Sequence, residues 1–216
     1  MSTITTTQEP VSSRTADPVT RWLPLGGVGY AVLGIVGTLV IDKFPDENTS
    51  TSALVRYYAA HHAQVARGGQ IAMLGCLFFG LFAAGLVART RRHPGIAAVI
   101  GVGAAAMLAI DAQTNATYAL LGQIGNESHI DPAALQAWHI SGAAFGSSVP
   151  TTLFLLGVAL AALAARALPR WVGWTALVLG LALLVPGLFG FFASLLIWPW
   201  ALVAGIVLAV GRPATD

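Results

Sequence analysis

The chain has 216 residues, of which 56% are hydrophobic and only 9% are charged, and its mean hydropathy is +0.74. A soluble domain carries roughly 25% charged residues, so this composition predicts an integral membrane protein. A net charge of +2 without a Lys/Arg cluster excludes a nucleic-acid-binding surface, and the single cysteine, Cys76, excludes an intrachain disulfide or a Cys-x-x-Cys site.

The amino-terminal region predicts a tail followed by a membrane span. Residues 1–20 are rich in Ser and Thr and have no apolar period, which is typical of a disordered tail. The apolar run at residues 23–41 lacks a small-residue cleavage site, so we expect it to stay in the membrane as the first span. Its glycines should let neighbouring helices approach closely, and these are Gly26, Gly27, Gly29, Gly34 and Gly37.

The next segment predicts an interfacial helix and two more spans. Apolar residues recur at spacings near three and four across residues 52–67, which indicates a short amphipathic helix on the outer membrane surface. This helix leads into a second span at residues 69–88. Pro94 is tolerated in the first turn of a helix and opens the third span at residues 94–121.

The remaining chain is long enough for three further spans. A fourth helix is expected at residues 133–165, in which Pro150 predicts a kink. Residues 171–210 contain no charged side chain and are too long for one crossing. We therefore expect two spans there, at residues 171–187 and 189–210.

Basic residues divide unevenly between the two sides of this six-span arrangement. With the amino terminus inside, the inner side collects eight of the eleven basic residues, and the outer side receives only Lys43, Arg56 and Arg67. The positive-inside rule therefore predicts that both termini are cytoplasmic. The sequence predicts an all-α, polytopic transmembrane helical bundle with a single domain over residues 21–212 in the cell (plasma) membrane.

The third span carries polar side chains at an unusual density. The stretch from Met107 to Tyr118 holds a carboxylate, two amides, two hydroxyls and a phenol within an apolar run. At helical spacing Asp111, Asn115 and Tyr118 share one face. Because a charge in a bilayer is costly, such a residue usually faces the bundle interior or a water-filled cavity. Asp111 is therefore the strongest candidate for a functional residue.

Depth along the helices predicts which residues meet Asp111. At about 1.5 Å per residue, Asp111 lies about 25 Å from Pro94, and His139 lies about 10 Å into the fourth helix from the opposite side. We therefore expect both in the outer half of the membrane, as the acid–base pair of a catalytic or binding site. The ligand-binding candidates around them are Asn115, Gln113, Tyr118, Gln70, Tyr58 and His61. No spacing favours a metal site, and no cofactor fingerprint occurs.

The sequence leaves three interpretations of this cluster open. In the first, the cluster handles a proton or a small polar solute, as part of a pore, carrier or sensor. In the second, the chain is a membrane-embedded isomerase or cyclase that acts on a lipid-like substrate, with Asp111 as general acid. In the third, Asp111 and His139 only tie two helices together, and the chain is a structural or assembly subunit. A homo-oligomer is compatible with each of the three.

Several short motifs resemble a known family. They are Arg21-Trp22, Val55-Arg56-Tyr57-Tyr58-Ala59-Ala60-His61, Asp131-Pro132-Ala133-Ala134-Leu135 and Leu168-Pro169-Arg170-Trp171-Val172-Gly173-Trp174. Together they are similar to uncharacterised actinobacterial six-helix integral membrane proteins with a domain of unknown function. The resemblance covers most of residues 20–210 and implies a six-helix membrane fold, but it brings no activity and no catalytic residue.

Overall fold

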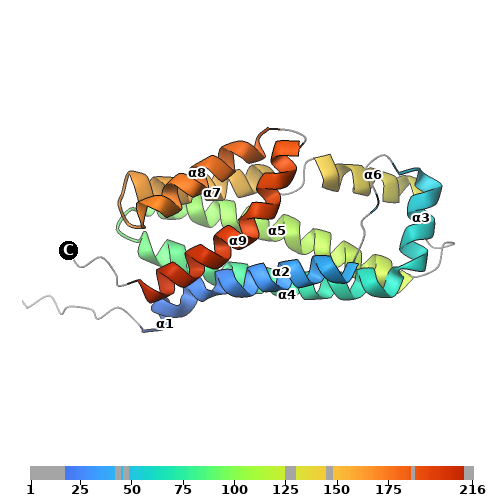
Figure 1. Ribbon diagram of the computed structural model, residues 1–216, viewed down its shortest axis with the longest axis horizontal. Helices are drawn as coiled ribbons and strands as arrows, with labels where there is room; N and C mark the ends of the chain where they lie inside the picture. Colours follow the sequence, from blue (N-terminus) through green and yellow to red (C-terminus); the bar gives the residue numbers. More distant parts are fainter. Residues whose placement is uncertain are drawn as a thin grey trace, which may run out of the picture.

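A computed structural model describes residues 18–41, 45, 49–124, 130–144, 148–185 and 188–211. Throughout these ranges the chain forms helices and no strand, so the predicted all-α class is confirmed (Figure 1). The helices are α1 (Pro18–Trp22), the short 3-10 helix η1 (Leu23–Leu25), α2 (Gly26–Ile41), α3 (Thr51–Ala60), α4 (His62–Arg89), α5 (Pro94–Ile124), α6 (Pro132–Ala144), α7 (Ser148–Leu163), α8 (Arg170–Leu183) and α9 (Leu188–Val210).

Three helical segments are long and apolar enough to cross a membrane. They are Val19–Ile41, His62–Arg89 and Pro94–Leu121. Three shorter apolar helices follow, at Val149–Leu163, Arg170–Leu183 and Leu195–Val210. Large apolar side chains such as Leu39, Leu77 and Val178 are exposed on the outside of the bundle, as expected for a surface that faces lipid.

Six helices pack into a closed ring. Going around it, α2 packs against α4, α4 against α5, α5 against α7, α7 against α8, α8 against α9, and α9 against α2. Figure 1 shows α2, α4 and α5 running along the length of the molecule, with α7 and α8 beside one half of it and α9 crossing at an angle. The ring is therefore complete in the half of the molecule that contains α7 and α8.

The two ends of the ring differ in chemistry. One end of the ring, which we call the arginine end, contains the start of α1, the α4–α5 turn, the α7–α8 turn and the end of α9 (Figure 1). There the guanidinium of Arg89 donates hydrogen bonds to the carbonyls of Thr20 (3.4 Å) and Leu208 (2.8 Å), which joins three segments. At the opposite end α3 lies across the bundle and packs against α6, and we call this the α3–α6 end.

Glycines bring the helices of the ring into backbone contact. A Cβ atom at Gly27 would lie 2.3 Å from the carbonyl oxygen of Ala201 on α9, and one at Gly26 would lie 2.3 Å from the carbonyl oxygen of Phe78 on α4. All five glycines predicted to allow close approach leave no room for a Cβ atom, since each would bring it within 3.0 Å of a neighbour. The prediction for this stretch is therefore confirmed.

The predicted helix at residues 52–67 is two helices in the structure. α3 ends at Ala60, and α4 already begins at His62. At the corner, the imidazole Nδ1 of His61 and its backbone N–H both lie 2.9 Å from the carbonyl oxygen of Tyr57, which closes the last turn of α3. Residues 62–67 are therefore the first turns of α4, and α3 is shorter than expected.

The predicted fourth helix at residues 133–165 is also divided. The chain forms α6 and α7 instead, and the three residues between them lie outside the described ranges. Pro150 is the third residue of α7, where the missing N–H leaves no intrahelical bond unmade. The proline therefore stands near the start of a helix and does not kink a longer one.

A methyl group at Gly103 should push α5 away from α7. A Cβ atom there would lie 2.5 Å from the backbone nitrogen of Phe154, whereas Gly101 on the same helix has nothing within 4 Å. We expect Gly103→Ala to lower the melting temperature of the detergent-solubilised protein by at least about 2 °C. Gly101→Ala should leave it unchanged or raise it, because Ala is the better helix former. Equal melting temperatures would contradict the close α5–α7 packing.

Candidate functional site

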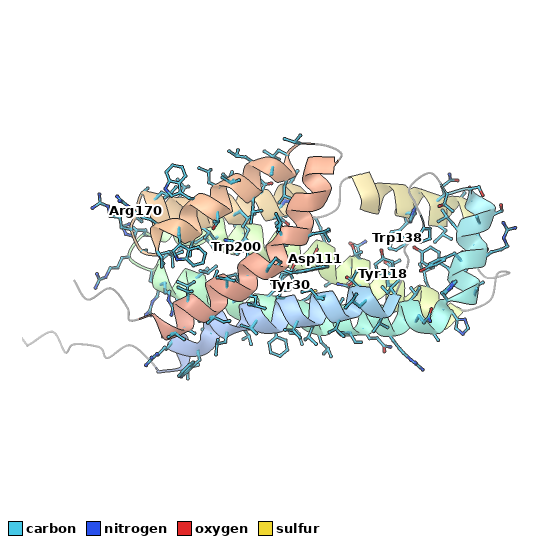
Figure 2. The ribbon with its side chains drawn as sticks, in the orientation of Figure 1. Tyr30, Asp111, Tyr118, Trp138, Arg170 and Trp200 are labelled. Carbon is cyan, nitrogen blue, oxygen red and sulfur yellow. The ribbon has the colours of Figure 1, made fainter. Side chains whose placement is uncertain are left out.

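A cavity lies inside the ring between α2, α4, α5 and α9. Its volume is about 230 Å³. Figure 2 shows two of its lining residues, Tyr30 and Asp111, next to each other where α9 crosses the bundle. The lining side chains that carry a polar atom are Tyr30, Thr38, Cys76, Asp111, Thr114, Asn115 and Trp198. The cavity therefore gathers polar groups from four helices.

The polar wall of the cavity is one face of α5. Asp111, Thr114 and Asn115 are spaced by three and four residues, so successive turns of the helix present them to the same side. The amide nitrogen of Asn115 donates a hydrogen bond to the sulfur of Cys76 on α4 at 3.7 Å. Asp111 and Asn115 therefore share one face of α5, as predicted from the sequence.

The facing wall comes from α2 and α9. The indole N–H of Trp198 donates a hydrogen bond to the hydroxyl of Tyr30. Gly34 makes this position accessible to the indole, because a Cβ atom there would lie only 2.8 Å from the Trp198 nitrogen. Thr38 donates its hydroxyl to the carbonyl of Gly34 in its own helix at 3.0 Å.

The cavity carries one carboxylate and no basic side chain among its described lining residues. Asp111 is half-buried and interacts electrostatically with Tyr30 and Cys76. Within the part of the chain that the structure describes, no group of three His, Cys, Asp or Glu side chains could hold a metal ion.

Cys76 defines the level of the cavity along the bundle. It lies fourteen residues after His62, where α4 begins, and thirteen before Arg89, where α4 ends, which corresponds to about 21 and 20 Å of helix. The cavity therefore lies near the middle of α4.

An aromatic core closes the ring between the cavity and the arginine end. Phe79, Phe82, Phe154 and Trp200 are all at most 7% exposed. The rings of Phe79 and Phe154 lie 5.1 Å apart, and those of Phe82 and Trp200 lie 6.0 Å apart. Trp200 is also held by α8, because its indole N–H donates a hydrogen bond to the hydroxyl of Thr175 at 3.0 Å. Tyr30 packs against this core through Phe79, with ring centroids 5.0 Å apart and the two rings tilted by 54°.

Two predicted ligand-binding residues belong to a different cluster. Tyr118 packs on Trp138 of α6, with ring centroids 5.0 Å apart, and Tyr58 of α3 lies 6.4 Å from the same indole (Figure 2). Burial raises the pKa of the Tyr58 phenol well above its ordinary value, and the neighbouring Tyr118 adds to this effect. Tyr58 therefore stays neutral and packs the α3–α6 end.

The remaining predicted residues do not line the cavity. Gln113 and Gln70 are exposed, on faces of α5 and α4 that turn away from the ring interior. His61 stacks on Tyr57 at the α3–α4 corner, with ring centroids 4.5 Å apart. His139 is half-buried on α6 and is not among the residues that line the cavity with Asp111.

A second, wider hollow lies between α3 and the start of α6. Its volume is about 420 Å³, and its lining includes Thr51, Ser52 and Arg56. Ser52 and Arg56 are exposed, and the hydroxyl of Thr51 already donates to the side chain of Gln136. This hollow is open surface without a buried polar group, so the smaller cavity at Asp111 is the better candidate site.

No family model, no curated protein and no solved structure matches this chain. The similarity to the actinobacterial six-helix family therefore stays a prediction from the motifs.

Proposed function

We propose that the chain is a multi-pass protein of the cell membrane with six spans and both termini in the cytoplasm. The arginine end, which would be cytoplasmic, carries six arginines in the described residues, whereas the other end carries Arg56 and Arg67. The spans would be α2, α4, α5, α6 with α7, α8 and α9. At about 21 Å, α8 is shorter than the roughly 30 Å hydrocarbon core, which local thinning of the bilayer can accommodate.

Cysteine labelling tests this orientation. Arg56 and Arg170 are both exposed and lie at opposite ends of the bundle. In a Cys76→Ser background, we expect Arg56→Cys to react with a membrane-impermeant maleimide on intact cells. Arg170→Cys should react only after the cells are permeabilised. The reverse pattern would contradict the proposed topology.

We propose that the cavity binds a proton or a small polar solute, most favourably a cation, through Asp111, and that the chain works as a carrier or sensor. The observation that carries this proposal is that the carboxylate of Asp111 lines a cavity inside the helical bundle, together with the polar side chains of Thr114 and Asn115 on the same helix. A carboxylate kept inside an apolar bundle is a marker of proton and ion handling in membrane proteins.

The aromatic core supports a carrier or sensor over an open pore. Phe79, Phe82 and Phe154 are fully buried between the cavity and the arginine end. Such a dry aromatic layer blocks passage of ions in this conformation. A solute would enter the cavity from the α3–α6 end, which is the outer end in the proposed topology.

Charge movement in reconstituted membranes tests the role of Asp111. We expect wild-type protein on a solid-supported membrane to give binding currents when the pH or the cation concentration is stepped, and Asp111→Asn to lose them. The cation signal should weaken at low pH, because protonation of the carboxylate removes its charge.

Asp131→Asn is the matched control. Asp131 is the second of the two acidic residues in the described ranges, and it only caps α6 through the backbone N–H of Ala133 at 3.0 Å. Asn also caps helices, so this variant should keep both the fold and the currents. Currents that are the same in wild type and Asp111→Asn would overturn the proposed function.

A further inference from the structure

The arginines at the arginine end differ in what they contact. Arg89 donates hydrogen bonds to backbone carbonyls, including that of Leu208 at 2.8 Å, and so holds the fold together. Arg166 and Arg170 stand on either side of the α7–α8 turn, and both are exposed. Within the described ranges the structure gives neither of these two guanidinium groups a hydrogen bond or an ion pair. Their charges are therefore available to a partner outside the chain.

Arg166 has an unusual backbone conformation. Its φ is 54°, and it is the one residue other than glycine with a positive φ in the part of the chain that the structure describes. Glycine usually takes such a position in the turn after a helix, because a side chain makes the left-handed conformation strained. Strain of this kind concentrates at functional sites. Here it accompanies a guanidinium group placed four residues before that of Arg170.

An apolar stripe on α8 leads away from these two arginines. α8 packs against α7 and α9, and its outer face exposes Trp171, Trp174, Val178 and Leu181. Their spacing of three, four and three residues places them in one line along the helix. Figure 2 shows Arg170 at the arginine end, where α8 begins. A molecule lying along α8 therefore meets positive charge at one end and an apolar surface along the rest.

We propose that the outer face of α8 binds an anionic phospholipid. The lipid phosphate would accept hydrogen bonds from Arg166 and Arg170, because the guanidinium fork matches the geometry of phosphate oxygens. The acyl chains would lie along the apolar stripe, and Trp171 and Trp174 would lie at the membrane interface, where indoles are enriched. In the proposed topology this is the cytoplasmic leaflet, whose surface is negative.

Charge and shape together select this class of molecule. Among the described residues no acidic side chain lies at the arginine end, because Asp111 lines the cavity and Asp131 caps α6 at the opposite end. The ammonium group of a zwitterionic phospholipid would therefore meet two positive charges and no negative one. A soluble phosphate would bind the arginines alone and would leave the apolar stripe uncovered. The site does not involve the cavity, so the proposal goes beyond the proposed function.

Thermal stabilisation of the delipidated protein in a neutral detergent tests the proposal. We expect dioleoylphosphatidylglycerol to raise the melting temperature of wild type by at least about 3 °C more than dioleoylphosphatidylcholine does, since a molecule that binds only the folded state stabilises it. Glycerol 3-phosphate at the same concentration should give no shift. Equal shifts with the two lipids would overturn the proposal. A shift with glycerol 3-phosphate as large as that with phosphatidylglycerol would assign the arginines to a soluble anion and would also overturn it.

Arginine variants locate the effect. Arg166→Gly removes a guanidinium group and relieves the left-handed conformation, so the lipid-free variant should melt at no lower temperature than wild type. Combined with Arg170→Gln, it should lose most of the shift given by phosphatidylglycerol. Arg56→Gln with Arg67→Gln removes the same charge from exposed residues at the α3–α6 end, and this control should keep the shift. Equal shifts in the two double variants would contradict a site on α8.

This proposal and the proposed function fail separately. The lipid test involves neither Asp111 nor the orientation of the chain, so its failure would leave the carrier or sensor function standing. Currents that do not depend on Asp111 would likewise leave lipid binding on α8 intact.

Discussion

Moving an ionised carboxylate to the centre of a membrane-spanning helix costs about 2.5–3.5 kcal/mol on insertion scales, and the surroundings of Asp111 reflect that cost. Interhelical polar bonds in membranes contribute only about 0.6 kcal/mol each on average. One such bond does not offset the burial, and a purely structural carboxylate would be an expensive way to join helices. The ring instead surrounds Asp111 with Tyr30, Asn115 and Cys76 and leaves a space beside it.

The same ring explains why the space lies where it does. Toward the arginine end, glycines bring α2 and η1 into backbone contact with α4 and α9, for example at Gly27 against Ala201 and at Gly205 against Pro24. There the interior is filled by the rings of Phe79, Phe82, Phe154 and Trp200. Beyond these rings the interior is lined by the smaller or polar side chains of Cys76, Asp111, Thr114 and Asn115, and the cavity lies there.

Unbroken apolar runs made the long helices predictable from the sequence. α2, α4 and α5 come from such runs, and their close-packing glycines were identified correctly. The sequence predicted a single helix at residues 133–165 where the structure has α6 and α7, because an average of hydropathy along the chain does not detect where one apolar helix ends and the next begins. The expected break at residues 186–187 lies outside the described ranges, between α8 and α9.

Only the site residues on α5 could be predicted from the sequence. Asp111 and Asn115 were identified because their polarity is anomalous in an apolar run. Their partners Tyr30, Cys76 and Trp198 look like ordinary span residues, and only the order of helices around the ring brings them together. Tyr118 lies on the same face as Asp111 but about 10 Å further along the axis, where it meets Trp138 instead.

The most direct test of a functional carboxylate is its effect on stability. Sites kept for function are often costly to the fold. We predict that detergent-solubilised Asp111→Asn melts at least about 2 °C above wild type, which corresponds to roughly 1 kcal/mol in a chain of this size. Asp131→Asn should have the same melting temperature as wild type. A melting temperature well below wild type for Asp111→Asn would show that the charge is paired and holds the helices together, and would contradict a site maintained for a ligand.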